Sequence, residues 1–267
     1  MVAVAGGVPT QADVDTVVRG ATFQRMASAN STFLSAHEEA LEYYRRIWVS
    51  DPLNNWSRRW EYPYIYESLR DHITGSATVL DAGAGTTFFP FFVASQLPQV
   101  QITAVDYDPM MAAVYDAAAD PLVEFVEGDI TKLPFRDAHF DGAYSVSVLE
   151  HIAERRHVLA ELARVLKPGA PLVFTMDISL DGRDDVPVAE ATELLRLAEE
   201  YFEAVDVPPL EEALRHPDAL LTTRVDPALL PWRWTWRGRL RKAASARRLP
   251  WKLTPPIAVY GCVWRRR

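Results

Sequence analysis

The chain has 267 residues, 49% hydrophobic and 24% charged, with a formal net charge of -8 at pH 7, which is the composition of a soluble globular protein with one core and extensions. Its single cysteine, Cys262, excludes an intramolecular disulfide and a thiolate metal cluster. The first nine residues lack the positive region of a signal peptide and no uncharged run approaches membrane-spanning length, so we expect a cytoplasmic protein.

The charge is distributed unevenly along the chain. Residues 1–231 carry 17 Lys and Arg against all 36 acids, whereas residues 232–267 carry 11 basic residues, no acid and five of the eight tryptophans. Cations beside aromatic rings can hold phosphates, anionic lipid headgroups or stacked bases. The alternative is that this segment neutralises the acidic body and packs as an ordinary edge. Peripheral membrane contact by the basic Trp-rich segment stays open.

Helical spacing predicts helices over residues 13–26 and 36–47, within a mainly helical lead-in of about 75 residues that should cap a cleft. Residues 54–64 follow, dense in aromatic rings and hydrogen-bond donors. They could form a lid over a substrate, with an arginine on an anionic group. The candidate acceptor-binding residues here are Arg58, Trp60, Tyr62 and Tyr64. The alternative is an aromatic corner packed between the lead-in helices and a sheet.

The most informative motif is a glycine turn after the first apolar run. Residues 78–80 lead directly into Asp81-Ala82-Gly83-Ala84-Gly85, and the apolar run 102–105 ends in Asp106, 21 residues after Gly85. Glycines allow the backbone to turn and approach a ligand, and an acid at the end of the next strand can accept both ribose hydroxyls. This pattern predicts a cofactor that contains adenosine. A dinucleotide fits less well, because Asp81 would face its pyrophosphate and Phe88 stands at the third glycine position.

Alternating strands and helices continue along the chain. The predicted strands cover residues 122–130, 171–176, 202–207 and 257–264, and residues 140–151 are predicted as a strand with its exit loop. The predicted helices cover residues 110–119, 158–166 and 188–201. Asp129 and Ile130 end the third predicted strand. Alternation of this kind predicts a parallel sheet with helices on both faces.

Taken together, residues 76–178 resemble the class I S-adenosylmethionine-dependent methyltransferases, in particular the small-molecule branch called methyltransferase type 11. The resemblance implies a Rossmann-like, doubly wound α/β fold whose seven-stranded sheet is mostly parallel. It divides the chain into a helical extension (1–75), a cofactor-binding core (76–207), a basic Trp-rich insertion that covers the acceptor (208–256), and a last strand with a basic tail (257–267).

The resemblance also implies the ligand contacts. Asp81 would help to hold the amino end of the methionine moiety of S-adenosylmethionine, and the backbone of Gly83, Ala84 and Gly85 would approach the cofactor closely. Asp106 would accept from the ribose hydroxyls and Tyr107 would flank the adenine. The remaining cofactor contacts would come from Asp129 to the adenine amino group, Ile130 through its backbone N–H, and Ser145 beside the methionine portion.

Catalytic residues are harder to assign from sequence. His151 follows the fourth strand and is the candidate base for a hydroxyl acceptor, since its reference pKa is near neutral. The same histidine could equally be a plain loop residue. Asp177 ends the fifth strand and could touch the acceptor. Tyr144 and Ser145 stand where metal-dependent relatives place a carboxylate, so we expect no metal.

The sequence therefore predicts methyl transfer from S-adenosylmethionine, with S-adenosylhomocysteine as product, to a small-molecule acceptor. A secondary metabolite, a sugar or a lipid-linked glycan is compatible, and the acceptor could be anionic. One alternative is an RNA methyltransferase that uses the basic segment, which the acidic body disfavours. Another is a partner protein that binds the cofactor without turnover.

Overall fold

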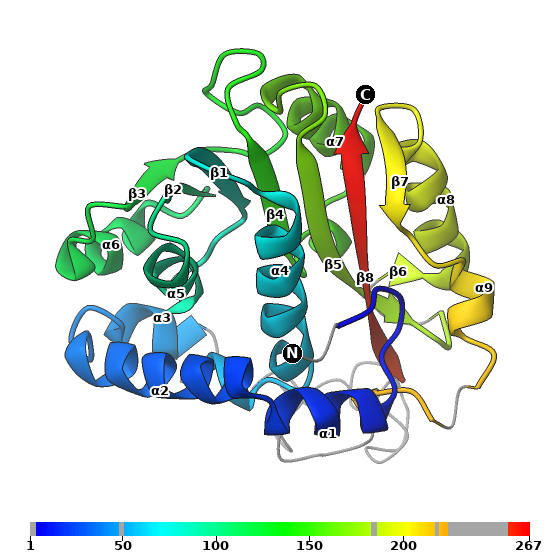
Figure 1. Cartoon of the computed structure of the whole chain (residues 1–267), viewed down its shortest axis with the longest axis horizontal. Coiled ribbons are helices and arrows are strands. Elements are labelled where there is room, and N and C mark those ends of the chain that lie inside the picture. The colour runs from blue at the N-terminus through cyan, green and yellow to red at the C-terminus, as the bar shows by residue number, and fades with distance from the viewer. Residues whose placement is uncertain (1–3, 48–50, 183–185, 217–218, 224–255) are drawn as a thin grey trace, which may run out of the picture.

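The chain folds around one mixed β-sheet (Figure 1), and the computed structural model describes residues 4–47, 51–182, 186–216, 219–223 and 256–267. The strand order is β3-β2-β1-β4-β5-β8-β7, with β6 paired to β5 off this path. The strands are β1 (Ala77–Ala82), β2 (Val100–Asp106), β3 (Val123–Glu127), β4 (Gly142–Val146), β5 (Pro171–Ser179), β6 (Val186–Pro187), β7 (Phe202–Asp206) and β8 (Ile257–Arg266). The predicted seven-stranded, mostly parallel sheet is confirmed, and β6 is a two-residue addition to it.

Strands β1 to β5 run parallel, whereas β8 is antiparallel to both of its neighbours, β5 and β7. Strand β1 lies between β2 and β4, with Ala82 opposite Val105 and Asp81 opposite Tyr144. The order of connection reverses at β1. Open α/β sheets place their ligand crevice at the carboxyl ends of the strands at such a switch point.

Both faces of the sheet are covered, as the apolar strand sequences require. Val79 belongs to the hydrophobic cluster that contains α4 (Arg58–His72) and α5 (Phe89–Gln96). The next residue, Leu80, belongs to the cluster that contains α7 (Arg155–Val165) and α8 (Val188–Ala198). Successive side chains of a strand point to opposite faces, so these two clusters are the two layers of the core.

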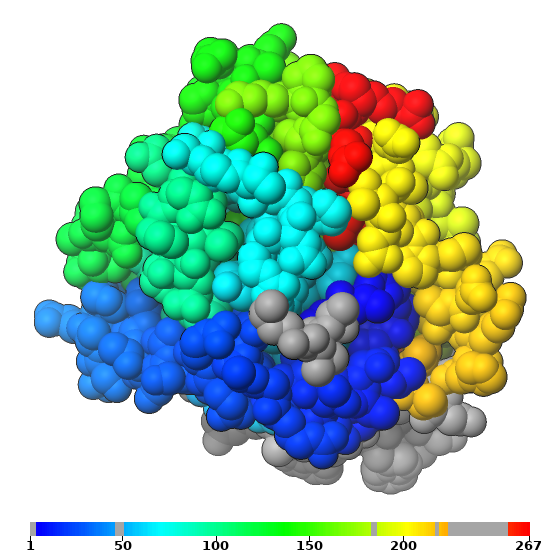
Figure 2. Space-filling model, in the orientation of Figure 1, coloured from blue at the N-terminus to red at the C-terminus, as the bar shows by residue number. Residues whose placement is uncertain are grey.

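The N-terminal helices differ from the predicted ranges. The structure has α1 (Gln11–Arg19), α2 (Ala21–Ala36) and α3 (Glu42–Ile47), so the helix predicted over residues 13–26 breaks at Gly20. Gly20 is extended, with φ -72° and ψ 150°, and caps the end of α1. In Figure 2 the blue N-terminal segment forms a band beside the cyan segment that contains α4.

The predicted lid over residues 54–64 is not a separate loop. Its first part is a short 3-10 helix, η1 (Pro52–Asn54), and its second part is the start of α4. Eleven residues of α4 are buried, because both its polar and its aromatic side chains face the sheet or the N-terminal helices. The segment therefore forms a wall of the molecule and not a separate loop, and its contact with a substrate stays a prediction.

Other helices are short connections: η2 (Pro109–Met111), α6 (Ala112–Ala118), η3 (Leu149–His151) and α9 (Leu210–Ala213). Most of the predicted acceptor cover over residues 208–256, including its basic Trp-rich part, lies outside the described residues. Within the described ranges, no helix is long and apolar enough to cross a membrane.

Candidate active site

A cavity of about 1130 Å³ opens at the carboxyl ends of β1, β2 and β4. Eight of the nine predicted cofactor-binding residues line it: Asp81, Gly83, Ala84, Gly85, Asp106, Tyr107, Asp129 and Ile130. From the predicted acceptor side, Arg58, Tyr62 and His151 also line it. The sheet therefore gathers side chains that are far apart in sequence.

The glycine turn after β1 needs both of its glycines. Gly83 and Gly85 have φ values of 79° and 56°, in the left-handed region that side chains with a Cβ rarely adopt. A Cβ on Gly83 would lie 2.6 Å from Cγ2 of Val148. The N–H groups of Gly83 and Ala84 donate to the carbonyl of Val105 at 2.9 and 3.0 Å. The turn is thus tied to the end of β2 and brings its backbone against the cavity.

Asp81 is a buried acid at the floor of the cavity. The hydroxyl of Tyr144 donates to its Oδ2 at 2.8 Å. Burial raises the pKa of Asp81 to about 8, against the opposing effect of the Tyr144 hydrogen bond. Without a cation beside it, Asp81 is therefore mostly protonated at neutral pH. A positive charge in the cavity would favour its ionised form.

Asp106 is oriented by the backbone at the end of β2. Its Oδ2 accepts from the N–H of Gly85 at 3.0 Å and its Oδ1 accepts from the N–H of Asp108 at 3.2 Å. Burial raises the pKa of Asp106 although these hydrogen bonds oppose the shift. Tyr107 beside it is 80% exposed, so its ring is free of the core. Asp106 and Tyr107 therefore form a polar and an aromatic contact at the same edge of the cavity.

Asp129 stands at the rim, on the loop after β3. Its Oδ1 accepts from the backbone N–H of Thr131 at 2.8 Å and from the Thr131 hydroxyl at 2.7 Å. These two hydrogen bonds hold the pKa of Asp129 below its ordinary value. Asp129 is therefore an ionised acceptor beside Ile130.

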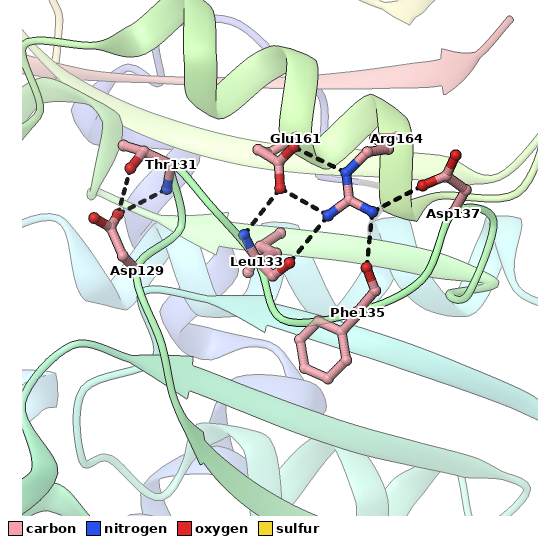
Figure 3. A network of polar contacts seen from close by, with 7 residues as sticks. All are labelled: Asp129, Thr131, Leu133, Phe135, Asp137, Glu161 and Arg164. Carbon is pink, nitrogen blue, oxygen red and sulfur yellow. Dashed lines mark hydrogen bonds and ion pairs between the residues drawn. The ribbon is translucent and has the colours of Figure 1, made fainter.

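This loop is fastened to the body of the molecule by one arginine of α7 (Figure 3). Arg164 donates to the carbonyl groups of Leu133 and Phe135 at 3.0 and 2.7 Å, and to Asp137 at 2.9 Å. Glu161 accepts from Arg164 at 2.9 and 2.8 Å and from the N–H of Leu133 at 2.9 Å. The clamp defines the path of the loop after Asp129.

The start of α4 forms the opposite wall of the cavity. Arg58 and Tyr62 are one helical turn apart and share the face that lines it. Trp60 and Tyr64 share another face, where their rings stack with centroids 4.8 Å apart in the core. The alternative of a packed aromatic corner thus describes Trp60 and Tyr64, and neither of them lines the cavity.

His151 is the last residue of η3 and is exposed at the cavity. Its backbone N–H donates to the carbonyl of Val148 at 3.0 Å. The short segment after β4 therefore places the imidazole of His151 at the same cavity as Asp81 and Asp106, the acids at the ends of β1 and β2. Among the described residues, no group of three or more His, Cys, Asp or Glu side chains is arranged to hold a metal ion.

Comparison with known proteins agrees with this geometry. The methyltransferase domain family matches residues 80–174, from β1 to β5. This part of the chain is therefore similar to methyltransferase domains. The O-methyltransferase resE of Aspergillus sclerotiorum is 31% identical over 136 residues, which are 49% of this chain and 48% of that protein.

A second relative covers more of this chain. A protein of Mycolicibacterium smegmatis named as a probable S-adenosylmethionine-dependent methyltransferase is 28% identical over 76% of this chain and 82% of its own length. The crystal structure of the cyclase SpnF is similar with a TM-score of 0.51 and 20% identity, over 82% of this chain and 85% of that one, which shows the fold alone. The chain spans less than half of the length of the first curated relatives it matches.

S-adenosylmethionine is the methyl donor of the family. The acidic side chains that line this cavity suit its chemical groups. Acids stand at the ends of β1 and β2 and after β3, where an ammonium group, ribose hydroxyls and an adenine amino group need acceptors. Among the described lining residues Arg58 is the single Lys or Arg, and it is paired with Glu61. A cofactor that carries phosphates would find little positive charge here.

Besides Trp60 and Tyr64, two more predicted site residues, Ser145 and Asp177, do not line the cavity. Ser145 is buried, and its hydroxyl donates to the carbonyl of Ala82 at 2.8 Å, which ties β4 to β1. Ser147, two residues later, lines the cavity instead. Asp177 is buried and lies within electrostatic reach of Arg58. Burial opposes a rise in the pKa of Arg58, but the charge of Glu61, and to a smaller extent that of Asp177, raises it.

Sequence reasoning missed several residues of the site. Tyr44 on α3 lines the cavity and is the contribution of the lead-in helices to it. Ser147 has φ 51°, which is rare for a residue with a Cβ and is found where the surroundings dictate the backbone. Glu61 is fully buried, although it stands in an aromatic run as an ordinary helix residue. The available signal was an acid set among the aromatic residues Trp60, Tyr62 and Tyr64.

Proposed function

We propose that this chain is a methyltransferase that transfers the methyl group of S-adenosylmethionine directly to a small-molecule acceptor. The observation that supports it most is the shared cavity, in which Asp81, Asp106 and Asp129 meet the wall formed by Arg58 and Tyr62. Its volume of about 1130 Å³ exceeds that of an ordinary single-ligand site of roughly 300 to 1,000 Å³. The cavity can therefore hold a cofactor and an acceptor side by side.

Each cofactor contact follows from the chemistry of the side chain. Asp81 would bind the ammonium group of the methionine portion, which favours the ionised form of a carboxyl whose pKa burial has raised. Asp106, already oriented by two backbone N–H groups, would accept from the ribose hydroxyls. Asp129 and the backbone of Ile130 would bind the adenine edge. The turn at Gly83 would allow close approach of the backbone.

The chemistry required of the protein is mainly alignment. A sulfonium cofactor supplies an electrophilic methyl group, and positioning a nucleophile behind it contributes about 7 to 11 kcal/mol. Arg58 and Tyr62 would orient the acceptor from the α4 wall. Tyr44, Tyr62 and Phe89 would exclude water from that end of the cavity. S-adenosylhomocysteine would be the second product.

A hydroxyl acceptor would also need to lose its proton. His151 is the candidate general base, because it is exposed at the cavity and an imidazole titrates near neutral pH. An acceptor that enters already deprotonated would not require it. His151 therefore carries the base role only for acceptors that enter protonated.

The test is a transfer assay with methyl-labelled S-adenosylmethionine and an extract of the source cells, followed by separation of small molecules, lipids, glycans, nucleic acids and proteins. Label in one small-molecule or lipid fraction is the expected result. Label in RNA or protein would reject the acceptor class. Cofactor binding without transfer to any fraction would reject the proposed activity, because a fold alone does not determine activity.

A further inference from the structure

The acceptor wall contains one guanidinium group whose donors are only partly used. The Nη1 atom of Arg58 contacts Oε2 of Glu61 and donates to the hydroxyl of Ser147 at 2.9 Å. Its Nε and Nη2 atoms make no hydrogen bond to any described residue, and neither atom is sealed from the cavity. Arg58 as a whole is only 8% exposed. A ligand at this wall would therefore meet N–H donors held in a fixed orientation.

The positive charge of Arg58 is already compensated. Glu61 is fully buried and its Oε1 accepts from the hydroxyls of Ser147 at 2.5 Å and Thr175 at 2.6 Å. Burial alone would raise the pKa of Glu61, but Arg58 and these hydroxyls hold it below its ordinary value, so the group is ionised. The charge of Asp177 also acts on Arg58. The guanidinium of Arg58 thus lies beside at least one buried anion, the carboxylate of Glu61.

Glu150 is a second buried acid within electrostatic reach of Arg58, although it does not line the cavity. Its carboxyl group is buried, has no hydrogen-bond partner beyond its own backbone among the described residues, and lies within the electrostatic reach of Asp177, Glu61 and Arg58. Burial, with the charge of Asp177, raises the pKa of Glu150 well above its ordinary value. Glu150 therefore adds little negative charge, and the ionised Glu61 is the group that leaves Arg58 with hydrogen-bond donors but little net attraction for an anion.

We propose that this wall selects a flat, electrically neutral acceptor through a carbonyl or hydroxyl oxygen bound by Arg58, and that Glu61 is the positioning residue that disfavours anionic acceptors. A neutral oxygen accepts from Nε or Nη2 without adding charge, whereas a carboxylate would bring another anion to a guanidinium that Glu61 already neutralises. The rings of Tyr44, Tyr62 and Phe89 line the same cavity and suit a planar molecule. This inference rests on the proposed function and replaces the expectation of an anionic acceptor.

Two probes that differ in one group test the selectivity. 4-Hydroxyacetophenone and 4-hydroxybenzoate share a phenol, and at about pH 6.5 only the second is an anion. Binding of S-adenosylhomocysteine alone is measured first by calorimetry, and its absence would overturn the proposed function together with this inference. With S-adenosylhomocysteine bound, we expect the ketone to bind about tenfold more tightly than the carboxylate. Equal affinities, tighter binding of the carboxylate, or no binding of either up to about 10 mM overturn the inference alone.

Glu61→Gln provides the second test, because it removes the compensating charge and keeps the shape. We expect the preference for the ketone to disappear, with carboxylate affinity about tenfold higher than in the wild type. Glu67→Gln is the matched control, since Glu67 is also buried on α4 but pairs with Arg70 and accepts from Thr22 at 2.7 Å. A folded Glu61→Gln protein with the wild-type preference contradicts the role of Glu61. If that variant does not fold, the comparison of the two probes on the wild type decides.

Discussion

At the scale of single residues, Asp81 and Asp106 show how the fold gives two acids of one cavity different surroundings. Asp81 is buried beneath the glycine turn and holds a proton at neutral pH, whereas Asp106 is fixed by two backbone N–H groups at the end of β2. Their positions could be predicted from sequence, because each follows an apolar run directly. Their protonation could not, because burial depends on elements that are distant in the chain.

The pKa of Asp81 predicts how cofactor affinity depends on pH. Binding an ammonium group to the ionised carboxyl requires loss of a proton whenever the pH is below about 8. Affinity for S-adenosylmethionine should therefore rise between pH 6 and 8, by at most about tenfold per pH unit. Calorimetry on the wild type and on Asp81→Asn measures this. A pH dependence that is unchanged in Asp81→Asn would exclude Asp81 as its source.

The same shift predicts a stability effect in the free protein. The folded-state pKa of Asp81 lies above the value in the unfolded chain, so the unfolded chain loses this proton first as the pH rises. Asp81 should therefore contribute stability that is present below about pH 4 and is lost as the pH rises to about 8. Asp81→Asn should reduce the loss of denaturant-measured stability between pH 5 and 8. An identical slope in both proteins would show that Asp81 ionises freely.

Asp106 predicts a loss of cofactor affinity without a loss of fold. Asp106→Asn removes the charge that would accept from two ribose hydroxyls, so the Kd for S-adenosylmethionine should rise by about tenfold to a hundredfold. Asp116→Asn, an exposed change on α6, is the control for net charge. Unaltered affinity in Asp106→Asn would remove Asp106 from the cofactor site.

His151 predicts a kinetic effect once an acceptor is known. For an acceptor that enters as a hydroxyl group, His151→Ala should lower kcat by roughly a hundredfold or more while cofactor affinity stays unchanged, because general base catalysis contributes on this scale. In His151→Ala, the rise of kcat with pH near neutrality should disappear. Near-normal turnover in His151→Ala would show that the histidine is a plain loop residue.

At the scale of elements, helix α4 explains why the acceptor wall was only half predicted. The sequence marks residues 54–64 as aromatic and polar, but it does not show where the helix begins. Once α4 starts at Arg58, its periodicity places Arg58 and Tyr62 at the cavity and Trp60 and Tyr64 in the core. The choice between these faces comes from packing against the sheet and the N-terminal helices.

The loop after β3 carries a prediction at this scale. Arg164 of α7 binds two carbonyl groups of the loop and two carboxylates, and so fixes the path of the chain beyond Asp129 (Figure 3). Arg164→Ala should weaken binding of S-adenosylmethionine by about tenfold, although Arg164 touches no part of the cavity. The control is Arg196→Ala, which breaks an exposed ion pair with Glu193 on α8. Equal cofactor affinity in the two variants would show that the loop holds its place without the clamp.

At the scale of the whole molecule, the parallel half of the sheet could be predicted, whereas the last two strands could be located in the sequence but not ordered within the sheet. Residues 78 to 176 alternate between apolar strands and helices, which predicts β1 to β5 and their crevice. Strand β8 comes last in the chain yet lies between β5 and β7, antiparallel to both. The pairing of strands that are far apart in sequence depends on which edge of the sheet is still unpaired. Local sequence patterns do not contain that information.

Cofactor binding should stabilise the whole molecule, because the cavity is built from both layers of the core and from strands β1 to β4. A ligand at a hundred times its Kd adds about 2.7 kcal/mol to the free energy of unfolding. S-adenosylhomocysteine should therefore raise the Tm of the wild type in a concentration-dependent way, and much less that of Asp106→Asn. Equal shifts in both proteins would place the ligand elsewhere.

The most direct test of the account is a crystal structure of the protein with S-adenosylhomocysteine. The account predicts the ligand at the carboxyl ends of β1 and β2, with its ribose on Asp106, its amino group toward Asp81 and its sulfur directed to the wall formed by Arg58 and Tyr62. A ligand bound outside this cavity, or one whose sulfur points away from the α4 wall, would contradict the proposed site and the proposed reaction.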